Sequence, residues 1–226
     1  MTGRGLRIVL LGAPGAGKGT QARRLSEAFD VPDISTGDIF RNAVTAGTPM
    51  GAAAKRFMDR GELVPDDVTI GIVRERLAQS DAAAGFVMDG FPRTAHQATA
   101  LDAMLAGMDQ TLDAVVEIAV PREILIERLT QRRSCTSCQA SYHLMSAPPK
   151  VADVCDRCGG TLVHRTDDSD KTIVHRLAVH DAQTAPLVSY YRGAGLLHTV
   201  DGTQPIDTAY EAIVAAAASQ GGGRAA

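Results

Sequence analysis

The chain has 226 residues and is 45% hydrophobic, 22% charged and 4% aromatic, values near those of ordinary globular proteins. These values exclude a disordered or fibrous protein, and the length suits one compact domain with small inserted lobes. Lys and Arg number 23 against 26 Asp and Glu, a formal net charge of −3. The chain therefore lacks the overall basic character of a protein that binds duplex nucleic acid, and we expect no nucleic-acid partner.

No apolar run reaches the length of a transmembrane helix, because the run Ile8–Leu11 is only as long as a strand. Gly12 and Pro14 interrupt that run at once, so it cannot form the apolar region of a signal peptide. We therefore expect a cytoplasmic protein that does not bind a membrane.

Short strand-like runs alternate with helical stretches along most of the chain. The runs expected to form strands are Arg7–Leu11, Asp33–Ser35, Gly85–Asp89, Ala114–Val120 and Leu196–Val200. A helix is expected over Lys18–Phe29, with Ala22, Leu25 and Phe29 on one face. Strands separated by helices imply right-handed crossovers, so the predicted class is α/β with a parallel five-stranded sheet flanked by helices.

Two segments interrupt this alternation. Residues 35–64 are expected to be mostly helical, with a turn at Gly47-Thr48-Pro49. Residues 131–168 hold every cysteine of the chain together with Pro148-Pro149 and Gly159-Gly160, and indicate an insertion with its own cross-linking centre. We therefore predict a core of residues 1–34, 65–130 and 169–226 that carries two inserted lobes. The tail Ser219–Ala226 is expected to be frayed.

The strongest chemical signal is the Gly-rich stretch GAPGAGK (12–18), which lies between the first strand and the first helix. Its glycines let backbone N–H groups point at a polyphosphate, the helix adds its positive end, and Lys18 reaches the outer phosphates. A turn that only connects strand and helix is the alternative. In the usual phosphate-binding loop a Ser or Thr follows the lysine directly. Here Gly19 follows Lys18 and the hydroxyl comes one residue later, at Thr20, so only some types of phosphate-binding loop match.

The cysteines form two CxxC pairs, Cys135/Cys138 and Cys155/Cys158. Four thiolates at this spacing can reach one Zn²⁺ tetrahedrally, and such a closed set leaves no open position for a reacting ligand. The spacing therefore predicts one structural zinc ion per chain, which holds a lobe too small to build its own core. Two local disulfides or a redox dithiol are the alternatives.

Several segments, taken in order, resemble adenylate kinase, a nucleoside monophosphate kinase. They are GAPGAGKGTQA (12–22), ISTGDIFR (34–41), DGFPRT (89–94) and RTDD (165–168), and the resemblance runs from about residue 7 to residue 206. It implies the bacterial type with a long zinc-binding lid at 131–168 that closes over ATP. It also implies a lobe at 35–64 that closes over AMP. The implied reaction is transfer of the terminal phosphoryl group from Mg-ATP to AMP, which gives two ADP, by a monomer.

The resemblance also assigns roles to individual residues. The cations implied to act in catalysis are Lys18, Arg93, Arg132, Arg165 and Arg176. The residues implied to bind ATP are Gly15, Ala16, Gly17, Lys18, Gly19, Thr20, Arg132, Ser141, Tyr142 and Gln204. The residues implied to bind AMP are Thr36, Arg41, Glu62, Leu63, Val64, Gly90, Phe91, Pro92, Arg93, Gln97, Arg165 and Arg176. A single arginine would suggest only a solvated surface residue, but these arginines match, in order along the chain, the arginine positions of the family.

Acidic and amide side chains complete the predicted site. Asp89 ends a strand beside the phosphates, where a carboxylate can hold the water shell of Mg²⁺. Asp38 is interpreted either in the same way or as a simple helix N-cap. Gln97 can both donate to and accept from the edge of adenine. Asp167 and Asp168 are expected to pair with Arg165 and Arg176 at the base of the lid, with a solvated acidic turn as the alternative.

Three other functions stay open at this point. The first is a related kinase with GTP as donor or with CMP or UMP as acceptor, against which Gln97 argues mildly. The second is a zinc-ribbon nucleic-acid-binding module on a P-loop domain, which the acidic balance disfavours. The third is a nucleotide sensor without turnover, which the set of arginines disfavours.

Overall fold

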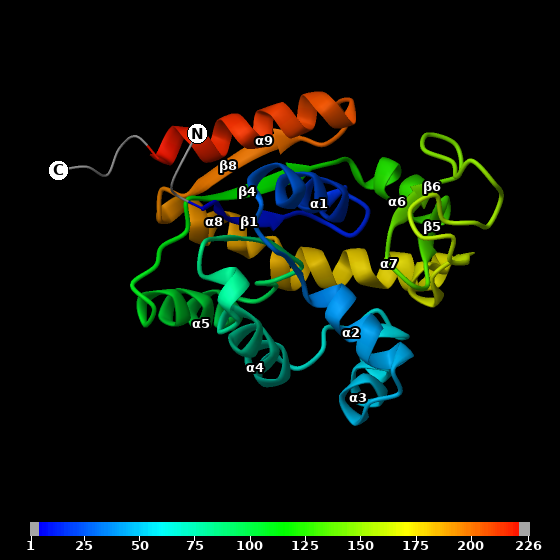
Figure 1. Ribbon diagram of the computed structural model, residues 1–226, viewed down its shortest axis with the longest axis horizontal. Helices are drawn as coiled ribbons and strands as arrows, with labels where there is room; N and C mark the ends of the chain where they lie inside the picture. Colours follow the sequence, from blue (N-terminus) through cyan, green and yellow to red (C-terminus); the bar gives the residue numbers. More distant parts are fainter. Residues whose placement is uncertain (1–4, 222–226) are drawn as a thin grey trace.

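A five-stranded parallel sheet organises the protein, and the computed structural model describes residues 5–221. The strand order is β2-β3-β1-β4-β8, with β1 (Arg7–Leu11) in the centre (Figure 1). The other strands are β2 (Asp33–Ser35), β3 (Phe86–Asp89), β4 (Ala114–Ala119) and β8 (Leu197–Asp201). Because every pairing is parallel, the carboxyl ends of all five strands lie at one edge of the sheet.

Both faces of the sheet are covered, which explains why its strands are apolar almost without interruption. Ile8 and Leu10 of β1 belong to the core shared with α1 and α9, whereas Val9 and Leu11 belong to the core shared with α4, α5 and α8. Figure 1 shows α1 and α9 on one side of the sheet and α4 and α5 on the other. The helices around the sheet are α1 (Lys18–Phe29), α4 (Asp66–Leu77), α5 (Ala95–Ala106), α6 (Arg122–Thr130), α7 (Asp170–Val179), α8 (Pro186–Gly193) and α9 (Ile206–Gly221). Short helical turns lie between them along the chain: η1 (Ser80–Ala82), η2 (Thr166–Asp168) and the π-helical η3 (His180–Thr184).

Between β2 and α4 the chain forms a helical lobe made of α2 (Thr36–Thr45) and α3 (Pro49–Met58). The Ser35 hydroxyl caps α2 by accepting from the N–H of Asp38. Thr48 caps α3 by accepting from the N–H of Gly51, and Pro49 stands at the first helical position, where its missing N–H costs nothing. Local sequence therefore sets where both helices begin.

Between α6 and α7 lies a second insertion, called the lid below. Its antiparallel sheet has the order β6-β5-β7 and consists of β5 (Arg132–Cys135), β6 (Ser141–His143) and β7 (Leu162–Val163). Its core is small and contains Cys135, Cys155, Ala140 and Leu162. In Figure 1 the lid lies at the right of the molecule and the α2–α3 lobe at its lower edge, and α7 runs from the core toward the lid.

The predicted α/β class and the parallel five-stranded sheet are confirmed, and each predicted strand agrees with the structure to within about one residue at either end. The predicted helix over Lys18–Phe29 is confirmed as α1, in which Ala22 and Leu25 are fully buried, whereas Phe29, at its end, is 38% exposed. The tail prediction is wrong up to Gly221, where α9 ends, and its remainder lies outside the described residues. None of the helices within residues 5–221 combines the length and apolar character needed to cross a membrane.

Candidate active site

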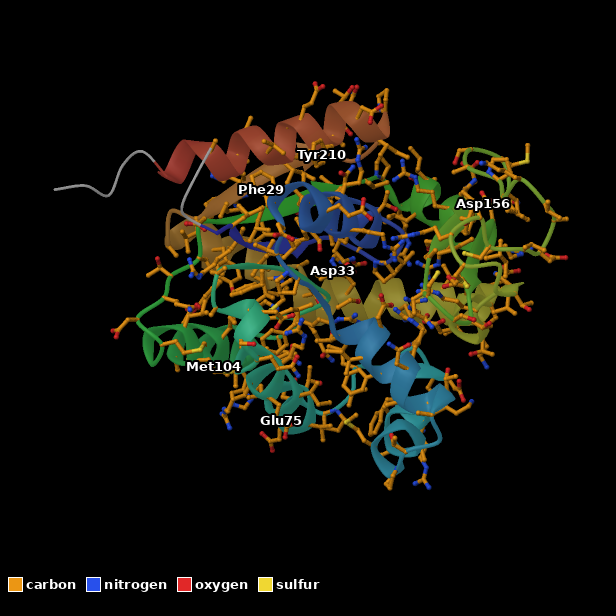
Figure 2. All side chains as sticks on the ribbon, in the orientation of Figure 1. Phe29, Asp33, Glu75, Met104, Asp156 and Tyr210 are labelled. Atoms are coloured by element: carbon orange, nitrogen blue, oxygen red, sulfur yellow. The ribbon has the colours of Figure 1, made fainter. Side chains whose placement is uncertain are left out.

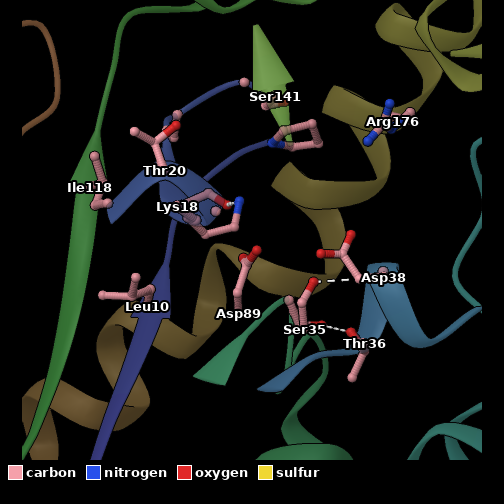
Figure 3. Close-up of a pocket in the computed structure, with 18 of the residues that line it drawn as sticks. Leu10, Lys18, Thr20, Ser35, Thr36, Asp38, Asp89, Ile118, Ser141 and Arg176 are labelled. Atoms are coloured by element: carbon pink, nitrogen blue, oxygen red, sulfur yellow. Dashed lines mark hydrogen bonds between the residues drawn. The ribbon is translucent and has the colours of Figure 1, made fainter. Parts of the chain in front are cut away.

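A cavity of about 400 Å³ opens where the carboxyl ends of β1 and β3 meet the two insertions. Its walls come from the loop before α1, from the α2–α3 lobe and from the lid. Figure 3 shows that Lys18, Asp89 and Arg176 approach this space from α1, β3 and α7. The position agrees with the general rule that open α/β sheets bind ligands beyond the carboxyl ends of their strands.

The loop between β1 and α1 is shaped to bind an anion. Gly12 has a φ of +142°, and a Cβ there would lie 2.8 Å from the Ile118 carbonyl oxygen, so only glycine fits. No side chain caps the N-terminus of α1, and its first turn carries no acidic residue. That helix end therefore presents its partial positive charge to the cavity.

Lys18 is held inside the curve of this loop. Its Nζ donates to the carbonyl oxygens of Gly12 at 2.8 Å and Ala13 at 3.0 Å. Burial lowers the pKa of Lys18 to about 8, and the nearby Asp89 carboxylate opposes that shift. A phosphate bound beside Lys18 would place a further negative charge next to its buried ammonium group and stabilise the charged form.

Asp168 joins two arginines at the base of the lid. Arg132 donates from Nε and Nη2 to its two carboxylate oxygens at 2.7 and 2.6 Å, and Arg176 donates from Nη1 at 2.6 Å. The Asp168 side chain is fully buried, so this network lies inside the protein. Arg176 also pairs with Asp167 at 3.0 Å. The structure thus confirms paired aspartates rather than a solvated turn, except that Arg165 donates from Nε to Ser134 Oγ at 2.6 Å and to neither aspartate.

Three further arginines bring positive charge into the cavity. Burial, together with repulsion from Arg132 and Arg41, lowers the pKa of Arg165 well below its usual value. Burial also lowers the pKa of Arg93, and the carboxylate of Asp89 offsets part of this shift. The buried Nε of Arg41 has no hydrogen-bond partner among residues 5–221. Cations gathered and desolvated in this way favour a multiply charged anion as ligand.

The segment after β3 links this charge to the α2–α3 lobe. The Gly90 carbonyl oxygen accepts from Thr36 Oγ1 at 2.8 Å and from Arg93 Nε at 2.7 Å. Gly90 has a φ of +78°, and a Cβ at this position would lie 2.8 Å from Arg93 Nη2. The glycine therefore lets Arg93 fold back over its own turn toward the cavity.

Gln97 lines the cavity, but the protein itself uses much of its amide. Its Oε1 accepts from the N–H of Arg93 at 2.8 Å, and its Nε2 donates to Asp66 Oδ1 at 2.7 Å. An amide has two donor hydrogens and two acceptor lone pairs, so one of each remains for a ligand. The sequence did not indicate this partnership with Asp66, which fixes the orientation of the amide.

The acidic residues divide into different roles. The interpretation of Asp38 as a helix N-cap is wrong, because Ser35 caps α2 and the Asp38 carboxylate pairs with Arg41. Asp33, which the sequence did not single out, lies near the middle of the molecule in Figure 2. Burial and, to a smaller extent, repulsion from Asp89 and Asp38 together raise its pKa to about 7.

The four cysteines come together in the lid as free thiols, so the disulfide alternative is wrong. All four Sγ atoms lie within 4.8 Å of one another; Cys135 to Cys158 is 3.5 Å and Cys138 to Cys155 is 3.6 Å. Zn–S bonds of about 2.3 Å in a tetrahedron require sulfur separations of roughly 3.8 Å. The N–H groups of Ser137 and Cys138 also donate to Cys135 Sγ, as suits a thiolate. The donor set therefore fits zinc.

The structure brings every predicted nucleotide-binding residue to the cavity except Phe91, which is fully buried in the core against α4 and α5. Phe91 entered the prediction only because it lies inside the DGFPR motif. Cavity-lining residues that the sequence left without a role include Arg23, Gln139, His180 and Thr184. No local motif marks them, because the folding of distant segments places them there.

The sheet, the loop before α1 and the arginine-lined cavity define a P-loop phosphotransferase. A sequence profile described as adenylate kinase matches residues 10–196. An adenylate kinase of Citrifermentans bemidjiense is 56% identical over 93% of this chain and 99% of its own, and one of Archaeoglobus fulgidus is 51% identical over 93% and 97%. An adenylate kinase of a Geobacter species is 55% identical over 93% of this chain and 99% of its own. The chain belongs to the adenylate kinase family.

Proposed function

We propose that this chain catalyses the reversible reaction of ATP with AMP to give two ADP. One observation carries the proposal: Lys18 and the arginines Arg41, Arg93, Arg132, Arg165 and Arg176 all line a single cavity between the lid and the α2–α3 lobe. Two nucleotides that meet through their phosphates bring together more negative charge than one cation can neutralise. The family and its relatives support the same reaction.

The donor, ATP, would lie along the loop before α1. The backbone N–H groups of Gly15–Thr20 and the ammonium of Lys18 would hold the β- and γ-phosphates. Arg132, Ser141 and Tyr142 of the lid, with the backbone near Gln204, would cover the rest of the nucleotide.

The acceptor, AMP, would lie against the α2–α3 lobe. Arg41 and Arg93 would hold its phosphate, since the buried Arg41 Nε has no hydrogen-bond partner in the described part of the chain and Arg93 is anchored at Gly90. The adenine would meet Thr36, the segment Glu62–Val64 and the remaining valences of the Gln97 amide.

Catalysis in this arrangement consists of positioning and charge neutralisation. The attacking oxygen of AMP is already ionised, so no general base is needed. Arg165 and Arg176 would stand between the two phosphate chains, where charge spreads over the transferred group. Asp168 fixes Arg132 and Arg176, and preformed donors of this kind need no reorganisation during the reaction.

Two metal ions belong to the proposal. Mg²⁺ arrives with ATP and shields its phosphates, and Asp89 would hold the water shell of that ion. Zn²⁺ would be held by Cys135, Cys138, Cys155 and Cys158, where it stabilises the lid and takes no part in the chemistry.

We further propose a monomeric, cytoplasmic enzyme whose partners are ATP, AMP and ADP. Thiolate ligands for zinc suit a reducing compartment. Residues 1–34, 65–130 and 169–226 would act as the core, residues 35–64 as the AMP-binding lobe and residues 131–168 as the moving lid.

The first test is phosphoryl transfer from Mg-ATP to AMP, GMP, CMP and UMP, with GTP as a second donor. Strong preference for AMP and ATP is expected. Preference for another base would contradict the role of Gln97 but not the phosphate site. Lack of transfer to any acceptor would favour the nucleotide-sensor function.

The second test is Lys18→Met, with the exposed Lys171→Met on α7 as matched control. We expect Lys18→Met to lower kcat by about a thousandfold, because a cation opposite the developing charge is lost, while the fold is retained. The control should stay near the activity of the wild type. Unchanged activity in Lys18→Met would contradict the assignment of the loop.

A further inference from the structure

One side chain touches both the cysteine cluster and the nucleotide cavity. Tyr142 of β6 lines the cavity and also packs against the small core formed around the cysteines. Its hydroxyl oxygen lies 3.5 Å from Cys155 Sγ. Tyr142 therefore borders both the cavity and the cysteine cluster.

The direction of the hydrogen bond to sulfur follows from the other partner of the hydroxyl. The backbone N–H of Asp156, on the lid in Figure 2, donates to Tyr142 Oη at 2.8 Å. A backbone N–H can only donate, so the hydroxyl accepts there and its own hydrogen is available for Cys155. A thiolate that binds zinc has no proton and accepts that hydrogen.

We propose that Tyr142 is a positioning residue that couples zinc in the lid to ATP in the cavity. Its hydroxyl donates to the Cys155 thiolate and thereby holds the zinc ligand, while the bound metal in turn fixes the ring as a wall of the donor site. The coupling rests on the proposed function, since it assumes that ATP occupies the lid side of the cavity.

The strand that carries Tyr142 makes this coupling direct. In the register of the lid sheet, Tyr142 lies opposite Arg133, and the adjacent pair joins His143 to Arg132. Arg132 in turn holds Asp168 through two hydrogen bonds. A shift of β6 after metal loss would therefore move both the ring and an arginine of the phosphate site.

The test measures zinc release from the zinc-loaded protein with a colorimetric chelator in excess. We expect Tyr142→Phe to release zinc at least about tenfold faster than wild type, the usual effect of removing a hydrogen bond to a metal ligand. The matched control is Tyr190→Phe on α8, which removes a hydroxyl bonded at 2.6 Å to Asp102, far from the lid. The control should release zinc at the rate of the wild type.

The coupling is measured by repeating the experiment with ATP alone, which cannot turn over without an acceptor. ATP is expected to slow zinc release from wild type, since coupling between two sites is reciprocal, and to slow it less in Tyr142→Phe. Equal zinc release from Tyr142→Phe and wild type would overturn the hydrogen bond, and equal protection by ATP would overturn the coupling. Neither measurement needs turnover, so phosphorylation of AMP by wild type still supports the proposed function if the coupling fails.

Discussion

At the scale of single residues, the fold buries titratable groups close to the cavity. Asp33 is the clearest case, because its Oδ1 is buried and has no hydrogen-bond partner among residues 5–221. Burial, together with repulsion from Asp89 and Asp38 and against the opposing effect of Arg23, raises its pKa to about 7. The carboxyl group is therefore neutral in the folded protein at pH values where it is ionised in the unfolded chain.

This shift predicts a stability change with a definite sign. The folded pKa exceeds the unfolded value of 3.8, so the contribution of Asp33 is fully present below pH 3.8 and is lost as pH rises through about 7. Asparagine does not ionise, so Asp33→Asn does not lose stability as the pH rises. We expect this variant to raise the free energy of unfolding at pH 8 by about 2 kcal/mol. Urea unfolding at pH 8 and pH 5 tests this, because the gain should shrink at the lower pH.

The matched control for Asp33 is the exposed Asp30→Asn, three residues earlier at the end of α1. Its φ of +53° is one that asparagine tolerates, so it should leave the difference between the two pH values unchanged. A gain in Asp33→Asn that is equal at pH 5 and pH 8 would contradict the role of ionisation.

Residues inside contiguous motifs could be predicted from sequence, whereas residues placed by the fold could not. The spacing of the glycines before Lys18 predicts a phosphate-binding loop, and the spacing of the CxxC pairs predicts a metal site. Asp33 is a lone acid at the start of a strand, and its pKa is raised by burial and by the closeness of Asp89 and Asp38, which the fold alone brings about. Phe91 shows the reverse error, since membership in a motif does not say which way a side chain points.

At the scale of elements, the α2–α3 lobe depends on close packing of its two helices. Gly51 of α3 lies so near α2 that a Cβ there would be 2.2 Å from the Ala43 carbonyl oxygen. This is a contact between backbones, and a rotamer change cannot relieve it.

Gly51→Ala should therefore displace the two helices and weaken the acceptor site. We expect the KM for AMP to rise about tenfold, equivalent to a penalty of about 1.4 kcal/mol, with little change in the KM for ATP. Gly71→Ala on α4 is the control, because a Cβ there meets nothing within 4 Å and the helix gains stability. An equal rise in both KM values would contradict a local effect on the lobe.

The strands of the main sheet could be predicted nearly to the residue because buried parallel strands are short apolar runs closed by Gly or Pro. The lid strands could not, since β7 has only two residues and β6 only three. They lie among turns and around the cysteine cluster, where hydrophobic periodicity gives no signal.

At the scale of the whole molecule, contacts across the cavity join the lid to its surroundings. Arg157 of the lid pairs with Glu27 of α1 at 3.3 Å, and Thr166 donates to Asp59 beyond α3 at 3.4 Å. These groups lie at the surface, so each contact contributes little and can open readily. These two contacts therefore add little to the stability of the lid's position.

Removal of zinc should act on the lid and spare the sheet. We expect a strong chelator to lower Tm by several degrees and to raise the KM for ATP more than that for AMP, while the circular dichroism of the core persists. Zn²⁺ should restore both values and Mg²⁺ should not. Absence of zinc from protein purified without chelator would contradict the proposed metal.

The pairing at the base of the lid bears on how such a protein can evolve. Arg132 and Asp168 bond to each other although they lie 36 positions apart in the chain, and Arg176 in the core joins them. These hydrogen bonds hold the two ends of the lid to the core without involving the cysteines. Sequence changes in the interior of this module can therefore leave both of its ends attached to the core.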